Sequence, residues 1–217
     1  MCRPQKGGKM SDKLVITIAR QYGSGGRDVG HRLAELMGAK CYDQDLIVMA
    51  AKKSGISEEA LAAADEQASS SLLYTLAMGA SMIYTNTTPM AVPINDALFI
   101  AQSEIIRELS ETENCVIVGR CADYILKDHT KLVKVFVQGD KPDRIKRIMS
   151  RAGISESEAK DRIAKKDKKR ASYYNYYTGG KWGKADNYNL IVSTSKIGVD
   201  GAAKLIYEYA KTLGYIE

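Results

Sequence analysis

Apolar residues follow two periodicities along this chain, and the two alternate. Residues 14–19 form a continuous β-prone run, which predicts a strand buried on both faces, as strands of parallel sheets are. A glycine-rich turn follows, and over residues 29–37 apolar positions recur at helical spacing until Gly38 ends the pattern. The chain therefore opens with a strand, a glycine turn and a helix.

The same alternation continues toward the C-terminus. It predicts a short apolar step at 39–42 and further strands at 115–118, 132–138 and 190–193. Helices are expected at 45–54, 95–110, 144–151 after an Asp140-Lys-Pro start, 156–170 and 199–213. This order implies βαβ crossovers, and hence an α/β fold with a parallel sheet of about five strands and helices on both faces.

The length of 217 residues fits one domain with inserts. Residues 1–12 are expected to be a disordered extension, and residues 57–84 are expected to form helices of an insert outside the sheet. The apolar stretch 72–84 is too short to span a bilayer, which needs roughly 20 residues. It is typical of a buried helix or an interface helix, so we expect no membrane partner and leave a homodimer open.

Composition narrows the class of partner. Hydrophobic residues make up 45% and charged residues 27%, which excludes a disordered chain or a membrane protein. The net charge of +6 favours acidic partners, and nucleotide phosphates and nucleic acid both qualify. The four cysteines form no CxxC pair and have no histidine at zinc-ligand spacing, so neither a disulfide framework nor a zinc site is indicated. A reducing cytoplasm fits this pattern.

The glycine turn is the first candidate site. A buried strand that leads through glycines into a helix brings backbone N–H groups and the positive helix end to one point, which suits an anion. Side chains would block phosphates there, and the turn consists of Gly23, Ser24, Gly25 and Gly26. The alternative is a glycine-rich turn that binds no ligand.

The turn departs from the P-loop pattern GxxxxGK[ST], because no lysine follows Gly25 or Gly26. Arg27 and Asp28 occupy the place where Lys and Ser/Thr are expected. We hypothesise that Arg27 supplies the missing positive charge, and that Asp28 holds Mg²⁺, which prefers oxygen ligands. Arg20, just ahead of the turn, is a second candidate phosphate contact. The expected cofactors are ATP and Mg²⁺.

Several segments together resemble one known family. Residues 18–27, Tyr42-Asp43, Val118-Gly119-Arg120 and the aromatic stretch from Tyr173 to Trp182 are similar to the cytidylate kinase-like family of nucleoside-monophosphate kinases. The resemblance implies the three-layer fold of P-loop nucleoside triphosphate hydrolases, with ATP and Mg²⁺ as donor. It also implies a helical insert at 55–95 near the acceptor site and a lid at 151–183.

The resemblance suggests roles for individual residues. Ordinary cytidylate kinases have Asp-Gly-Arg-Asp where this chain has Val118-Gly-Arg-Cys121, so Arg120 would bind the acceptor monophosphate although both acids are missing. The alternative for Arg120 is a surface arginine at a strand end. Asp43 would lie near the acceptor nucleotide. Arg147 and Arg151 would close over the ATP phosphates, whereas a solvated helix face is the expectation for Arg144.

The basic segment 165–170 is the last candidate. Most such runs are solvated helix faces, but the resemblance places Lys166, Lys169 and Arg170 where lid residues neutralise the transferring phosphoryl group, with Lys166 toward the acceptor. The aromatic stretch after it is expected to pack the lid against the body more than to stack on bases.

The pattern therefore predicts a nucleotide kinase that transfers the terminal phosphate of ATP to a nucleoside monophosphate. CMP or dCMP is the expected acceptor. The catalytic candidates are Arg27, Arg120, Lys169 and Arg170. A nucleotide-binding regulatory protein without turnover, or a kinase of another small molecule, is the alternative, because the P-loop lysine is missing. We expect no nucleic-acid partner.

Overall fold

The computed structural model describes residues 12–54 and 94–216 of the chain. The chain divides into two compact units, residues 1–43 with 106–217, and residues 44–105. The expected N-terminal extension, except for Asp12, and nearly all of the expected insert at 55–95 lie outside the described residues. The single kinase-like domain with an insert and a lid stays a prediction.

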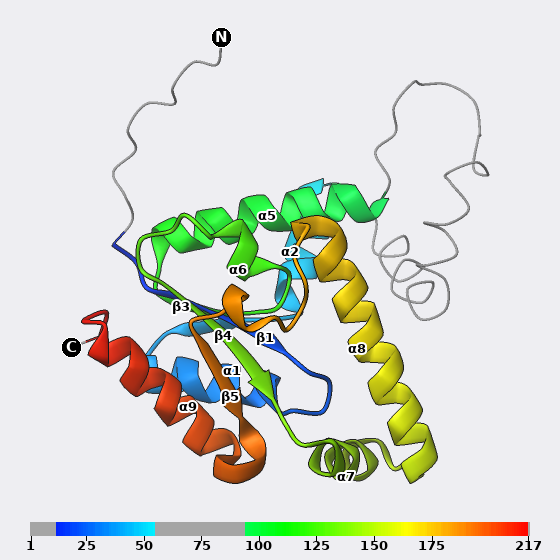
Figure 1. Ribbon diagram of the computed structural model, residues 1–217. Coiled ribbons are helices and arrows are strands. Elements are labelled where there is room, and N and C mark those ends of the chain that lie inside the picture. The colour runs from blue at the N-terminus through cyan, green and yellow to red at the C-terminus, as the bar shows by residue number, and fades with distance from the viewer. Residues whose placement is uncertain (1–11, 55–93, 217) are drawn as a thin grey trace, which may run out of the picture. The chain divides into compact units, whose positions relative to one another are not determined.

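The first unit is built on a five-stranded sheet in which every strand pair is parallel (Figure 1). The strands stand in the order β2-β3-β1-β4-β5, so the first strand of the chain is the central one. Their bounds are β1 Val15–Arg20, β2 Lys40–Tyr42, β3 Cys115–Val118, β4 Leu132–Gln138 and β5 Leu190–Ser193. The sheet confirms the predicted α/β class with about five parallel strands.

Helices connect the strands. In the first unit they are α1 Gly26–Met37, α6 Ala122–Ile125, α7 Lys141–Ala152, α8 Glu156–Thr178, the 3₁₀ turn η1 Ala185–Asn187 and α9 Thr194–Thr212. The second unit contains α2 Asp45–Ser54 and the first part of α5 Ile94–Thr112, whose end belongs to the first unit. No helix within the described ranges is long and apolar enough to cross a membrane.

One face of the sheet carries most of the hydrophobic core. Side chains that alternate along β1, β3 and β4 pack against α1 and α9, which lie on the same side of the sheet (Figure 1). Val29 and Leu33 of α1 and Ile206 of α9 are completely buried there. Removing this apolar surface from water is the main force that holds the two helices on the sheet.

The opposite face is covered by the chain that follows α8. Phe136 of β4 points away from α1 and α9, and its ring lies 5.4 Å from that of Trp182 and 5.0 Å from that of Tyr188. Aromatic rings at such separations pack favourably in edge-on or tilted arrangements. The expected packing role is therefore confirmed for Trp182, and both faces of the sheet are covered.

Helix α8 is longer than the sequence pattern predicted. It begins with a capping box in which Ser155 and Glu158 satisfy each other's backbone N–H groups, and it ends at Gly179, whose φ of 66° suits a glycine. The aromatic residues Tyr173 to Tyr177 are its last turns and not a separate segment. Intrinsic propensity is weak for tyrosine in a helix, and tertiary packing of the buried Tyr174 overrides it.

Candidate phosphate-binding site

The turn between β1 and α1 requires its glycines. Gly23 and Gly25 have φ angles of +79° and +80°, a left-handed backbone that other residues adopt only with strain. Gly25 precedes α1 without a side-chain cap, and a Cβ on Gly26 would stand 2.6 Å from Cβ of Arg20. The first N–H groups of a 12-residue helix thus meet at an uncluttered turn, as an anion site requires.

Hydrogen bonds from two other elements hold the turn in place. Ser24 Oγ donates to the carbonyl of Gln21 at 2.9 Å, and Thr194 Oγ1 at the start of α9 donates to the carbonyl of Ser24 at 2.6 Å. Arg147 of α7 donates from Nη1 to the carbonyl of Gly23 at 2.6 Å. These contacts use carbonyl groups and leave the turn preorganised.

A second unusual turn follows β3, the neighbour of β1. Gly119, Arg120 and Cys121 have φ angles of 84°, 58° and 55°, three left-handed residues in a row. This conformation costs a non-glycine residue about 1–2 kcal/mol. Such strain gathers at ligand sites, where it fixes a side chain or a backbone group in position. It sets Arg120 at the carboxyl end of β3, beside the glycine turn's own strand.

Arg20 links the two turns. Its stem lies against Gly26, and a Cβ on Gly119 would meet its Nη1 at 2.5 Å, so the side chain runs from one glycine to the other. Burial lowers the pKa of Arg20 to about 10, and repulsion from Arg170 adds to this effect. Arg120 and Arg27 act in the same direction. Asp43 is the carboxylate that acts on Arg20 against these three arginines.

Asp43 draws two of the arginines together. It follows β2, its side chain is only 7% exposed, and its Oδ1 accepts from Nη2 of Arg20 at 3.0 Å. Its Oδ2 pairs with Nε of Arg27 at 2.9 Å, while the side chain of Arg27 stays 51% exposed. Asp43 faces Arg20, Arg27, Arg120 and Arg170, and Asp167, which also acts on Arg170, is already paired with Arg144. The carboxyl ends of β1, β2 and β3 therefore carry an excess of positive charge that favours an anion.

The comparisons with known proteins agree with this geometry. The sequence profile of the cytidylate kinase-like family matches residues 15–196. The chain belongs to the cytidylate kinase-like family. The crystal structure of an uncharacterized protein from Eubacterium ventriosum is 30% identical, with a TM-score of 0.68, over 92% of this chain and 99% of its own. No curated protein matches the sequence.

More distant structures show the fold. Shikimate kinase from Bacteroides thetaiotaomicron has a TM-score of 0.53 at 13% identity, over 91% of this chain and 98% of its own. Shikimate kinase from Acinetobacter baumannii, in complex with shikimate, has a TM-score of 0.51 at 13% identity, over 93% of this chain and 94% of its own. The three-layer α/β fold of P-loop kinases, predicted from the sequence, is thereby confirmed.

Helix α7 brings two further predicted residues of this cytidylate kinase-like protein to the turn. Besides Arg147 at Gly23, Arg151 forms an ion pair with Asp28 in the first turn of α1. Asp28 is the residue predicted to hold Mg²⁺, which commonly takes one or two carboxylates together with substrate phosphates. The carboxylate of Asp28 beside the turn suits that chemistry, although it would have to serve both Arg151 and the metal ion.

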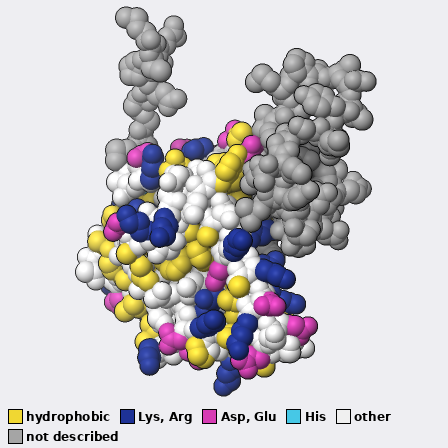
Figure 2. All heavy atoms as spheres, turned by 45° about the vertical axis from the view of Figure 1, so that its right-hand side comes forward, with side chains coloured by type: hydrophobic (Ala, Val, Ile, Leu, Met, Phe, Trp, Pro, Cys, Tyr) yellow, Lys and Arg dark blue, Asp and Glu magenta, His cyan; other side chains and the backbone are white. Residues whose placement is uncertain are grey.

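Helix α8 contributes Arg170 to the same place. Its Nη1 donates to the carbonyl of Arg20 at 3.0 Å, and its guanidinium lies 5.5 Å from the centre of the Tyr22 ring. Burial lowers the pKa of Arg170, whereas Asp167 and Asp43 counteract this. Lys169 is half-buried, and Lys166 is exposed. Among the described contacts, none joins Lys166 to the arginines. Figure 2 shows Lys and Arg side chains gathered at the lower right of the described surface.

The expectation for Arg144 is wrong. Its side chain is 8% exposed, its Nε donates to the carbonyl of Tyr22 at 2.8 Å, and it forms an ion pair with Asp167 of α8. Asp167 also accepts from the N–H of Tyr22 at 2.7 Å, so the pair holds the entry to the glycine turn. Helical spacing alone could not show which face of α7 is buried. The one sequence signal was Asp167, the single carboxylate inside the basic run 165–170, which needed a cationic partner.

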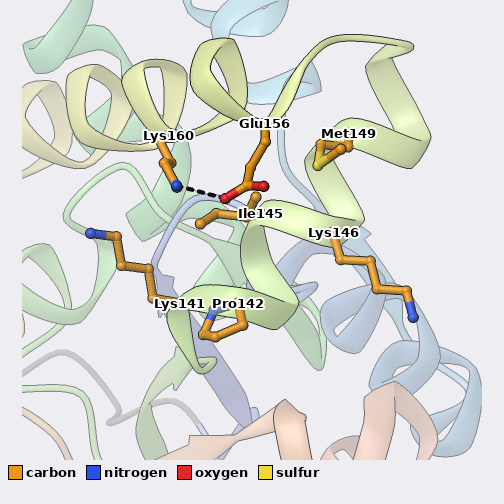
Figure 3. A pocket seen from close by; sticks show the side chains of 7 residues that line it. All are labelled: Lys141, Pro142, Ile145, Lys146, Met149, Glu156 and Lys160. Atoms are coloured by element: carbon orange, nitrogen blue, oxygen red, sulfur yellow. Dashed lines mark ion pairs between the residues drawn. The ribbon is translucent and has the colours of Figure 1, made fainter.

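A shallow hollow between α7 and the start of α8 lies apart from these groups. Pro142, Ile145 and Met149 form its apolar wall, and Lys160 pairs with Glu156 one turn earlier on α8 at 2.6 Å (Figure 3). None of the predicted site residues lines it. The candidate phosphate contacts therefore lie at the turns at the sheet edge and not in this hollow.

Proposed function

We propose that the protein transfers the terminal phosphoryl group of ATP to a nucleoside monophosphate. A phosphate oxygen of the acceptor attacks the γ-phosphorus, and the bond from that phosphorus to the β–γ bridging oxygen breaks. The bridging oxygen keeps the electron pair and leaves with ADP, so the products are ADP and a nucleoside diphosphate. No side chain has to accept a proton in this balance.

The observation that carries the proposal is the contact of Arg20 with both Gly26 and Gly119. The glycine turn begins a helix and suits the donor phosphates, whereas the strained turn at Arg120 lies at the end of the adjacent strand. In open parallel sheets, ligands bind outside the carboxyl ends of the strands. Two phosphate-binding turns joined by one buried cation are what a transfer between two phosphates needs.

The residues then have separate tasks. The turn of Gly23, Ser24, Gly25 and Gly26 would receive the donor phosphates through backbone N–H groups, and Arg147 holds the turn. The N–H groups of Ser24 and Gly26 also donate within the turn, each at 3.3 Å, so phosphates would compete with these long bonds. Arg120 would bind the acceptor phosphate, for which a guanidinium fork is well shaped. Arg27, Lys169 and Arg170 would neutralise charge as the phosphoryl group moves, with Arg151 and Lys166 nearby on their helices. Positioning and charge neutralisation supply most of the rate in such transfers.

Magnesium fits the same turn. When bound to ATP, Mg²⁺ would neutralise charge on its phosphates, and Asp28 is the carboxylate of α1 placed to hold it. Asp43 is less suited to a metal, because both of its oxygens already pair with arginines. Its task would be to orient Arg20 and Arg27 between the donor and the acceptor phosphates.

The acceptor base is the open part of the proposal. CMP and dCMP come first because of the family. Shikimate is the second acceptor to test, since two solved structures of similar fold are shikimate kinases. A regulatory protein that binds ATP without turnover is the alternative that the missing lysine favours.

The test measures ADP release with Mg²⁺ and ATP against a panel of all nucleoside and deoxynucleoside monophosphates and shikimate. We expect ADP release that depends on one monophosphate and stops when EDTA removes Mg²⁺. Arg120→Ala should lose this activity, whereas the exposed Arg162→Ala on α8 should keep it. Binding of ATP without ADP release for any acceptor would show that the protein is regulatory.

A further inference from the structure

The glycine turn differs from the P-loop pattern at two linked positions. When GxxxxGK is aligned on Gly25, its first glycine falls on Arg20 and its lysine falls on Gly26. The chain thus has a cation where the pattern has a glycine and a glycine where it has the cation. The start of α1 at Gly26 supports this alignment, because the pattern's lysine follows the glycine that enters the helix.

The structure shows why the two positions exchange together. A Cβ on Gly26 would stand 2.6 Å from Cβ of Arg20 and 3.3 Å from its Cδ. Atoms do not approach so closely without displacing one another, so a side chain at 26 and the stem of Arg20 compete for one space. Arg20 occupies that space, and Gly26 is required because of it.

The charged end of Arg20 reaches the place where phosphates would meet. Its Nη1 lies 2.5 Å from the position that a Cβ on Gly119 would take, and its Nη2 is held by Asp43. The side chain is 17% exposed, so it is largely withdrawn from water yet keeps an open edge. Asp43 pairs with this desolvated charge, but it also pairs with Arg27, and Arg120 and Arg170 repel Arg20 as well, so an incoming polyphosphate would supply further compensation.

We propose that Arg20 is the phosphate-binding cation of the turn and takes the place of a P-loop lysine from six residues earlier in the chain. The inference rests on the proposed function for the identity of the ligand, a nucleoside triphosphate. It assigns to Arg20 the task that the sequence pattern alone suggests for Arg27. Arg27 is half exposed and its Nε is engaged by Asp43, so it stands at the rim of the cluster.

The experiment exchanges the two residues. The double variant Arg20→Gly with Gly26→Lys restores GxxxxGK and lets the lysine stem follow the path that the arginine leaves. The matched control is Arg20→Gly with Gly26→Met, which fills the same space without a charge. Titration calorimetry measures the Kd of ATP with Mg²⁺ and of inorganic tripolyphosphate for the full chain, and thermal melts confirm folding.

We expect Arg20→Ala to raise both Kd values by roughly tenfold or more, because a charged partner of the phosphates is lost. Arg27→Ala should have the smaller effect. Gly26→Lys alone should bind poorly, since the new lysine stem collides with Arg20. The double variant with Gly26→Lys should recover most of the affinity, whereas the double variant with Gly26→Met should not. If Arg20→Gly does not fold, Arg20→Gln gives the same comparison against Arg27→Gln.

Three results would overturn the inference. Kd values of Arg20→Ala within about twofold of wild type would exclude Arg20 as the cation, because losing a charged contact usually costs more. Equal recovery of affinity by the two double variants, with Gly26→Lys and with Gly26→Met, would show that Arg20 only fills space. A wild-type protein that binds neither ATP nor tripolyphosphate would refute this inference and the proposed function together. Binding without turnover would refute the proposed function alone, because the Kd values still decide the role of Arg20.

Discussion

The hydroxyl of Tyr174 donates a hydrogen bond to Oδ2 of Asp123 across 2.8 Å, and both side chains are buried. The bond joins α8 to α6, which begins directly after the left-handed pair Arg120 and Cys121. Burial raises the pKa of Asp123, and the hydrogen bond from Tyr174 acts against this shift. The helix that carries Arg170 is therefore tied to the segment that positions Arg120 through a carboxyl group that titrates at a raised pH.

The first prediction is a pH dependence of stability at Asp123. Because the folded state holds this proton more tightly than the unfolded chain, the group's contribution is full below about pH 4, the ordinary range for Asp, and is lost as the pH rises toward the raised folded pKa. Asp123→Asn keeps an oxygen that can accept from Tyr174 and removes the charge. In urea titrations from pH 4 to 8, the stability of this variant relative to wild type should increase with pH.

The exposed Asp128→Asn serves as the control for the loss of one negative charge. Its stability relative to wild type should change far less over the same range. A constant difference between Asp123→Asn and wild type from pH 4 to 8 would show that the carboxyl of Asp123 titrates alike in the folded and unfolded states.

The sequence predicted the sheet well because each strand is a local pattern. Buried parallel strands are continuous apolar runs, and the runs at 115–118, 132–138 and 190–193 have the same bounds in the structure. The central place of β1 and the order of the strands are long-range properties that no local pattern contains. Helix α6 was missed, since four residues are too few for a periodic signal.

The candidate site was predictable only as far as backbone chemistry goes. Glycines between a strand and a helix indicate an anion site wherever they occur, and the turn at 23–26 has the expected geometry. Side-chain partners are set by tertiary packing, so the pairing of Asp43 with Arg20 and the burial of Arg144 could not be foreseen. The competition between Arg20 and Gly26 appears only when the two positions are seen in space.

The second prediction concerns the ion pair of Arg144 and Asp167. Removing the carboxylate leaves a buried guanidinium without its charged partner, and breaking a buried pair in this way typically costs 3–5 kcal/mol. Asp167 is 20% exposed, so we expect a loss of about 2–3 kcal/mol for Asp167→Ala in chemical denaturation. Asp161→Ala on the exposed face of the same helix should change stability by less than about 0.5 kcal/mol. Similar losses of stability in the two variants would mean that water replaces Asp167 as the partner of the Arg144 guanidinium.

The third prediction separates strain from ligand binding at Arg120. A glycine adopts φ near 58° without the cost of about 1–2 kcal/mol that a side chain brings, so Arg120→Gly should be at least as stable as wild type, and Arg120→Ala less stable than Arg120→Gly. Both variants should bind CMP more weakly while the Kd of ATP changes little, as calorimetry would measure. Equal losses for CMP and ATP would show that Arg120 does not distinguish acceptor from donor.

The fourth prediction tests the glycine turn with two glycines that share one backbone conformation. Gly25 and Gly153 have φ angles of +80° and +63°, so an alanine at either position should cost about 1–2 kcal/mol through left-handed strain. Their surroundings differ. A Cβ at Gly25 would lie 3.2 Å from Val199 and 3.4 Å from Arg147, next to the space for phosphates, whereas nothing lies within 4 Å of a Cβ at Gly153.

Gly25→Ala should therefore lose the stabilisation by ATP, and Gly153→Ala should keep it. A ligand that binds only the folded state stabilises it by about 2.7 kcal/mol at a hundredfold excess over Kd, which a thermal melt resolves. The melting temperature is measured with and without millimolar ATP and Mg²⁺ for wild type and both variants. Because both variants carry left-handed strain and each is compared with its own melt without ATP, a difference in their ATP response reports on the turn and not on stability. An ATP shift retained in Gly25→Ala would mean that the phosphates bind elsewhere, whereas a shift lost in both variants would mean that general destabilisation is enough to abolish binding.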